Sequence, residues 1–180
     1  MLSYIGIVFG LTFLLRVYMD LEGSLLFTYI VALFYSMVIY TIYGNFTFRV
    51  SFNLWWVFLI LLTSSLLVDS ELPFPRIYCS VKTFIVISLM GPLSEELIFR
   101  GVLLSLNDNV LLNATIFSLL HFNPKPKENW FTLIYAFFFG LVAGESVLSS
   151  ESLFCAILFH VLNNSLEFIL KCRGVKIHWR

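Results

Sequence analysis

Long hydrophobic runs recur along the whole chain and are separated by short polar stretches. A helix that crosses a hydrocarbon core about 30 Å thick needs roughly 20 mostly apolar residues. Runs near this length lie between charged residues, Gly, Pro or Asn, so we expect an all-α fold, a polytopic transmembrane bundle of about seven helices. The expected helices are Leu2–Tyr18, Leu25–Tyr43, Phe52–Val68, Ile77–Leu106, Val110–Phe122, Trp130–Leu148 and Ser152–Leu170.

Two of these runs depart from the ordinary length of a spanning helix. Ile77–Leu106 is too long and contains Gly91-Pro92, which should kink or restart the helix because proline lacks a backbone N–H and clashes with the preceding turn. Val110–Phe122 is too short to cross the hydrocarbon core, because a helix of this many residues is only about 20 Å long. His121, near its end, is therefore expected below the membrane surface, in a cavity lined by protein.

The composition supports a bilayer as the solvent. Hydrophobic residues make up 59% of the 180 residues, charged residues 12%, and the mean hydropathy is +0.92, against about 45–50% and 25% in soluble domains. The net charge is zero and no basic cluster is interleaved with aromatics outside the C-terminal tail, which excludes a nucleic-acid partner. Without repeats or linkers, residues 1–180 are expected to form one membrane domain, with the first run kept as a helix rather than cleaved as a signal.

Basic residues predict the orientation, because cytoplasmic loops carry an excess of Lys and Arg. A cytoplasmic C-terminus and an external N-terminus leave only Arg49 outside and Arg100 within a span. The remaining basic residues then lie on the inner side: Arg16, Arg76, Lys82, Lys125, Lys127, Lys171, Arg173, Lys176 and Arg180.

The three cysteines, Cys79, Cys155 and Cys172, lie in or beside different apolar segments and show no CxxC spacing. We interpret them as small membrane hydrophobes rather than as a disulfide set or a metal cage.

Ionisable and amide side chains inside membrane spans are candidates for function, because burying them in lipid is costly. Glu96 and Arg100 are four residues apart and can form an ion pair on one helix face, which leaves Glu95 facing elsewhere. A plain interhelical salt bridge would also explain such a pair, and a lone histidine can be a hydrogen-bond partner between helices. Further polar groups in later spans favour a shared interior site: His121, four residues after Phe117, and His160, Asn163, Asn164 and Glu167.

Together these groups suit water-mediated hydrolysis of a peptide bond. Glu95 with His121 would act as the general base that activates water. His160 and Asn164, one helical turn apart, would donate hydrogen bonds to the oxyanion of the tetrahedral intermediate.

Other mechanisms fit the sequence less well. There is no Gly-x-Ser-x-Gly motif, the aspartates all lie at loops, and Cys155 precedes His160 by five residues, which is not a helical neighbour spacing. No cofactor is expected. Zinc is the alternative, since Glu95, His121 and His160 form a common ligand set, although His-Glu-x-x-His is absent.

At these residues the chain resembles the CPBP family, the CAAX-protease and bacteriocin-processing membrane proteins also called the Abi family. Three motifs carry the resemblance, in order: Glu-Glu-x-x-x-Arg at Glu95, Glu96 and Arg100; Phe-x-x-x-His at Phe117 and His121; and His-x-x-x-Asn at His160 and Asn164. The resemblance implies a catalytic core over residues 77–170, the same catalytic set of Glu95, His121, His160 and Asn164, and support from Glu96, Arg100 and Phe117.

The resemblance implies an intramembrane endopeptidase that cleaves a membrane-associated peptide or protein. The alternative within the family is a non-catalytic partner, either a bacteriocin self-immunity protein or a modulator of a sensor kinase. A transporter would need paired broken segments in two halves, which are not seen. The compact length favours a multi-pass protein of a bacterial plasma membrane.

Overall fold

The computed structural model describes residues 21–51, 53–66, 79–121 and 129–172. Within these ranges the protein is helical, and its only β pairing is one isolated bridge between Thr47 and Ser152. The all-α expectation is therefore confirmed for the described residues, which form six continuous helices. The expected helix Leu2–Tyr18 lies outside the described residues. The helices are α3 (Leu21–Tyr43), α4 (Trp55–Leu66), a long helix from Val81 to Leu106, α8 (Val110–Leu120), α9 (Asn129–Ser150) and α10 (Phe154–Cys172).

The long helix changes its hydrogen-bond register instead of breaking. After Ser80, whose side chain caps the first turn, it runs through α5 (Val81–Phe84), η3 (Ile85–Met90), α6 (Gly91–Glu96), η4 (Leu97–Leu103) and α7 (Leu104–Leu106). The two η segments are π-helical, a form that is common at functional sites. Gly91 donates its N–H to the Val86 carbonyl, and the next residue, Pro92, has no N–H to donate. The expected disturbance at Gly91-Pro92 is thus a π-helical turn.

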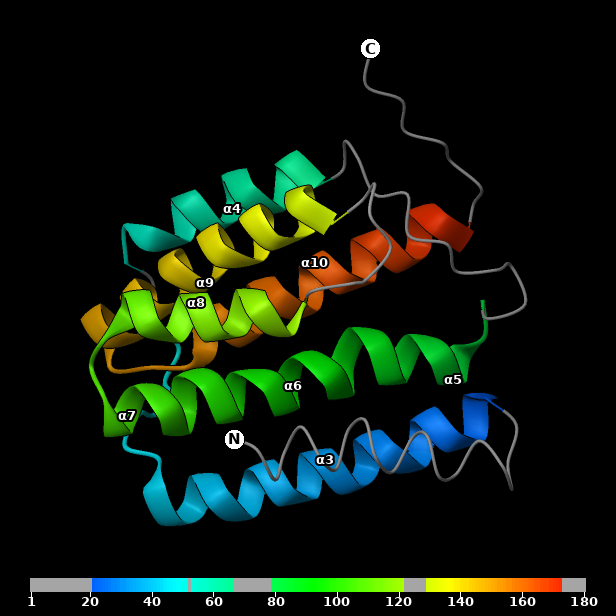
Figure 1. Ribbon diagram of the computed structural model, residues 1–180, viewed down its shortest axis with the longest axis horizontal. Helices are drawn as coiled ribbons and strands as arrows, with labels where there is room; N and C mark the ends of the chain where they lie inside the picture. The colour runs from blue at the N-terminus through cyan, green and yellow to red at the C-terminus, as the bar shows by residue number, and fades with distance from the viewer. Residues whose placement is uncertain (1–20, 52, 67–78, 122–128, 173–180) are drawn as a thin grey trace.

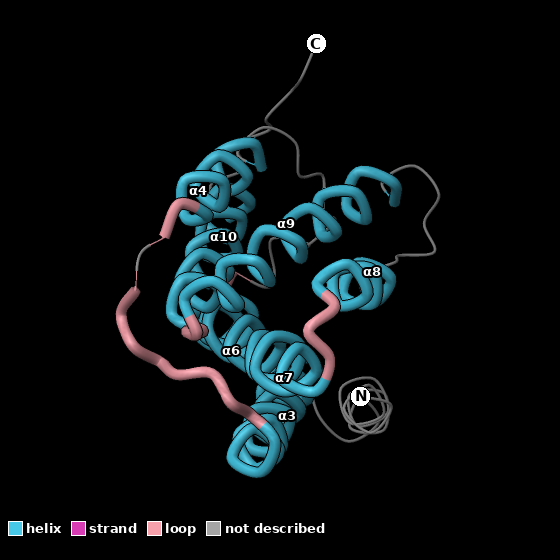
Figure 2. The backbone as a smooth tube through the Cα atoms, turned by 90° about the vertical axis from the view of Figure 1, so that its left-hand side faces the viewer, coloured by secondary structure: helices cyan, strands magenta, loops and turns pink. Residues whose placement is uncertain are grey.

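The long helix lies at the centre of the bundle. In Figure 1 it separates α3 on one side from α4, α9 and α10 on the other, and Figure 2 shows the same arrangement end-on, with α8 beside α9. The residues that will form the candidate site lie on its middle turns, in α6 and η4, and the helices around them cover these turns. Glu96, Ile98, Phe99 and Arg100 are accordingly buried.

Glycine allows the close approach of α8 and α9. A Cβ atom on Gly140 would lie 2.9 Å from the Ala114 Cα, closer than real side chains come to backbone. It would also lie 3.4 Å from Arg100 Nη2, so this glycine makes room both for α8 and for the buried guanidinium. Small residues at helix contacts are typical of membrane bundles.

Two of the described helices are long and apolar enough to cross a membrane, in the windows Leu26–Tyr43 and Thr132–Ser150. Val110–Leu120 and Phe154–Leu170 are shorter apolar helices. Among the described residues, a bundle of seven full spans is therefore not confirmed. The short length expected for the helix that ends near His121 is confirmed.

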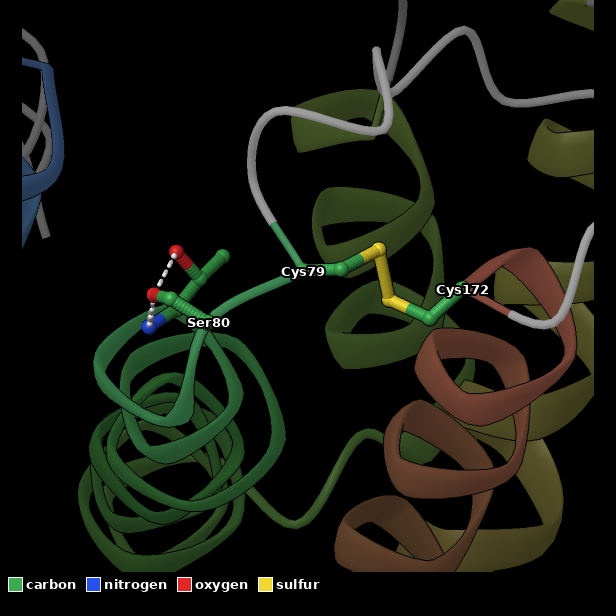
Figure 3. Close-up of a disulfide and its surroundings, with 4 residues drawn as sticks. Cys79, Ser80 and Cys172 are labelled. Carbon is green, nitrogen blue, oxygen red and sulfur yellow. Dashed lines mark hydrogen bonds between the residues drawn. A yellow bond between two sulfur atoms is a disulfide. The ribbon is translucent and has the colours of Figure 1, made fainter.

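The interpretation of the cysteines was wrong for two of the three. Cys79 and Cys172 form a disulfide, with an S–S distance of 2.05 Å and a Cα–Cα distance of 5.6 Å, and only Cys155 is free. Figure 3 shows why: Cys79 lies directly before the first turn of α5, and Cys172 lies in the last turn of α10. The antiparallel packing of these helices brings together two positions 93 residues apart. The bond ties the helix that carries Glu95 to the helix that carries His160.

Candidate active site

The predicted ion pair between Glu96 and Arg100 lies in the centre of the bundle. Arg100 Nη1 lies 3.0 Å from Glu96 Oε1, and neither side chain is exposed. The guanidinium carbon lies 4.1 Å from the centre of the Phe117 ring and 5.9 Å from that of Phe139, so aromatic faces stabilise the cation. Phe117 therefore supports the site through Arg100 as well as through its place one turn before His121.

His160 joins this pair from α10. Its Nδ1 lies 2.7 Å from the same Glu96 Oε1 that binds Arg100, and the imidazole is nearly buried. Because a carboxylate oxygen accepts, Nδ1 carries a proton and Nε2 faces the other glutamate, Glu95.

Glu95 faces both histidines, as its separation from the ion pair predicted. Its Oε2 lies 3.9 Å from His121 Nε2 and 3.9 Å from His160 Nε2. These separations are too long for direct hydrogen bonds, and Oε2 is a buried oxygen without a hydrogen-bond partner among the described residues. The side chain is 22% exposed, whereas that of Glu96 is fully buried. Of the two adjacent glutamates, Glu95 is therefore the one within reach of water.

The tautomer of His121 follows from its backbone partner. His121 caps the C-terminus of α8, and its Nδ1 lies 2.8 Å from the Phe117 carbonyl oxygen one turn earlier. A carbonyl can only accept, so Nδ1 holds the proton and Nε2 keeps its lone pair toward Glu95. At 34% exposure, this imidazole is the most accessible of the charged or basic groups in the cluster.

Asn164, one turn after His160, points its amide at the long helix. Its Nδ2 donates a hydrogen bond of 3.0 Å to the carbonyl oxygen of Ile87 in η3. An amide nitrogen carries two N–H groups, so one remains for a second acceptor. The structure thus brings Glu95, Glu96, Arg100, Phe117, His121 and His160 into one cluster, with Asn164 at the adjoining turn.

Three residues near the site were not found from the sequence. Asn113, nearly fully buried in α8, donates from Nδ2 to the Phe99 carbonyl oxygen at 2.6 Å, and an amide inside an apolar run was the signal that could have found it. Tyr29 of α3 packs near Gly91, where an added Cβ would lie 3.4 Å from its ring, and it lies within electrostatic range of Glu95. Tyr135 donates to Asn163 at 2.9 Å. Neither tyrosine belongs to a motif, so sequence spacing offered no signal.

Zinc is the alternative cofactor that the sequence predicts. Within the described ranges, no group of three or more His, Cys, Asp or Glu side chains is placed to hold a metal ion. Zinc ligands lie about 2.0–2.3 Å from the ion. Glu95, His121 and His160 have the chemistry of zinc ligands, and Glu95 Oε2 lies 3.9 Å from each histidine Nε2. We derive no step through a metal.

The sequence model of the family described as type II CAAX prenyl endopeptidase Rce1-like matches residues 79–166, just under half of the chain. These residues contain every motif residue named above, and the match supports the CAAX-protease family. No curated protein and no solved structure matches the chain. The resemblance inferred from the three motifs is therefore confirmed.

Proposed function

We propose that this protein is an intramembrane endopeptidase that hydrolyses a peptide bond of a membrane-associated peptide or protein with water as the nucleophile. The observation that carries the proposal is the position of Glu95, whose Oε2 lies 3.9 Å from Nε2 of His121 and of His160. A carboxylate and two imidazoles that converge in a partly accessible part of a membrane-protein interior are the groups that water activation needs.

Glu95 and His121 are the general base of the proposed reaction. The Glu95 carboxylate and the His121 Nε2 lone pair are both acceptors, so one water molecule can donate a proton to each and direct its own lone pair at a carbonyl carbon. The backbone bond from His121 Nδ1 to Phe117 keeps the ring in this tautomer. The proton taken from water is then available for the leaving amine.

His160 and Asn164 stabilise the oxyanion. In its doubly protonated form, His160 donates from Nε2, while the 2.7 Å bond from Nδ1 to Glu96 fixes the ring. Asn164 donates through the second N–H of its amide nitrogen. Glu96, Arg100 and Phe117 support these groups, because the buried ion pair supplies the charge that holds the His160 ring.

In a membrane, such a site receives its substrate within or at the edge of the bilayer, and we place the protein in the plasma membrane as a multi-pass chain. The basic residues favour a cytoplasmic C-terminus and an external N-terminus. The disulfide favours the reverse, because it lies at the C-terminal end of α10, and disulfides persist in oxidising compartments. The redox state of this pair in cells therefore tests the orientation.

The decisive experiment compares wild type with Glu95→Gln, His121→Ala and the matched control Glu145→Gln, all purified in detergent and supplied with membrane peptides. We expect Glu95→Gln and His121→Ala to abolish cleavage while the thermal unfolding midpoint stays within a few degrees, and Glu145→Gln to cleave normally. Cleavage should also persist in strong chelators, because the base is formed by side chains alone.

Two outcomes would overturn the proposal. Cleavage at the wild-type rate by Glu95→Gln would exclude Glu95 as the base, and loss of activity in chelators with rescue by zinc would replace the mechanism with a metal-dependent one. An immunity protein or a kinase modulator would keep its cellular phenotype in the Glu95→Gln variant, so a phenotype that survives this substitution would favour the non-catalytic role.

A further inference from the structure

A chain of hydrogen bonds leads from α9 to Asn164. His160, Asn163, Asn164 and Glu167 share one face of α10, at helical spacings of three and four residues. Tyr135 of α9 donates its hydroxyl to Asn163 Oδ1 at 2.9 Å. Asn163 Nδ2 donates in turn to Asn164 Oδ1 at 3.5 Å, and Asn164 Nδ2 donates to the Ile87 carbonyl at 3.0 Å. Each link in this chain joins one donor to one acceptor.

The far end of the chain fixes its direction. In an α-helical register the Ile87 carbonyl would accept from Gly91, but the Gly91 N–H bonds to Val86. In the π-helical register it would accept from Pro92, which has no N–H. Asn164 supplies the missing donor. A carbonyl can only accept, and the nitrogen is the only donor of the Asn164 side chain, so the amide nitrogen must face Ile87. Oδ1 then faces Asn163, whose own oxygen faces Tyr135.

We propose that Tyr135 and Asn163 are positioning residues that hold the Asn164 amide in the one orientation in which it can donate to the oxyanion. This inference rests on the proposed peptidase function. If the amide rotated by half a turn, its oxygen would face both the Ile87 carbonyl and the developing oxyanion, and both contacts would be repulsive. The hydroxyl of Tyr135 acts on the reaction through two amides and does not touch the reacting atoms.

The same tyrosine offers a clean substitution. Its ring stacks on Phe139, with centroids 6.3 Å apart and an interplanar angle of 24°, and Phe139 packs edge-on against His160 at 5.1 Å. Tyr135→Phe keeps this aromatic stack and removes only the hydroxyl. Tyr43→Phe, at a half-exposed position at the end of α3, is the matched control.

The test is a double-mutant cycle of Tyr135→Phe and Asn164→Ala, with kcat and KM measured for each variant. Loss of one hydrogen bond corresponds to about a 3- to 10-fold change. We expect Tyr135→Phe to lower kcat by that factor with KM within about twofold, and to have no further effect in the Asn164→Ala background. Tyr43→Phe should leave both constants unchanged. If Tyr135→Phe lowers kcat in the Asn164→Ala background as much as it does in wild type, the proposal is overturned. An unchanged kcat of the Tyr135→Phe single variant would also overturn it.

Failure of the peptidase proposal is recognised separately. If wild type and Glu95→Gln do not differ in cleavage, the proposed function falls, and the same cycle is read from thermal unfolding midpoints. Coupled effects of the two substitutions on the midpoint would then support the hydrogen-bond chain, whereas independent effects would overturn it.

Discussion

Replacing Arg100 with methionine should destabilise the protein strongly, because Glu96 would keep a carboxylate in a site without solvent. Both side chains are fully buried, so water does not screen the charge that remains. Removal of one partner of a buried ion pair costs about 3–5 kcal/mol. His160 stays 2.7 Å from Glu96 and continues to donate, which places the expected loss near the lower end, at about 3 kcal/mol. For a chain of this size, such a loss lowers the unfolding midpoint by roughly 6–12 °C.

The chain carries its own reporter for this measurement. Cys155 is free and buried, whereas Cys79 and Cys172 are bonded to each other. Under non-reducing conditions in detergent, a fluorogenic maleimide should therefore label Cys155 only as the bundle opens, and its signal gives the midpoint directly.

A second substitution separates charge burial from lost packing. Glu96→Gln combined with Arg100→Met removes both charges, so the double variant should recover most of the lost stability. It should remain inactive, because the charged carboxylate that accepts from His160 Nδ1 is lost. An Arg100→Met variant as stable as wild type would refute the reasoning, as would a double variant that is no more stable than the single one.

Two further predictions concern the packing and the disulfide. Gly140→Ala should lower stability by about 1–3 kcal/mol, because its Cβ would lie 2.9 Å from Ala114 Cα in the facing helix; an unchanged unfolding midpoint would contradict the close approach of α8 and α9. Cys79→Ser should lower stability by about 2–4 kcal/mol through loss of the cross-link. Cys155→Ser is the control, and the unfolding of both variants is measured by circular dichroism. Thiol trapping in intact cells gives the orientation: a bonded pair places this end of the bundle in an oxidising compartment and rejects a cytoplasmic C-terminus, whereas free thiols support it.

The sequence was sufficient for the elements that depend on hydrophobic length and helical spacing. The run predicted at Leu25–Tyr43 corresponds to α3, and the break expected at Gly91-Pro92 is the π-helical turn that precedes Gly91. The spacing of Glu96 and Arg100 predicted their ion pair and the separate direction of Glu95, because these relations are set within one helix.

Relations between helices could not be predicted in this way. Cys79 and Cys172 meet only because α5 and α10 pack side by side, and nothing local to either cysteine indicates a partner 93 residues away. The bond from Asn164 to Ile87 depends on which carbonyl the π-helical turn leaves without a donor, and a hydrophobicity pattern does not contain this register. Tyr135 resembles any other aromatic of an apolar run until its hydroxyl is seen beside Asn163.

The placement of Glu96 and Arg100 on one helix has a consequence for biogenesis. An arginine or an acidic residue at the centre of an inserting helix opposes insertion by about 2.5–3.5 kcal/mol. Here the two charges lie one turn apart on the same segment, so they can neutralise each other as soon as that turn forms, before any other helix has arrived. His160 joins this pair only when α10 docks against Glu96. The charged pair can therefore form before the site is complete, because α10 follows the long helix in the chain.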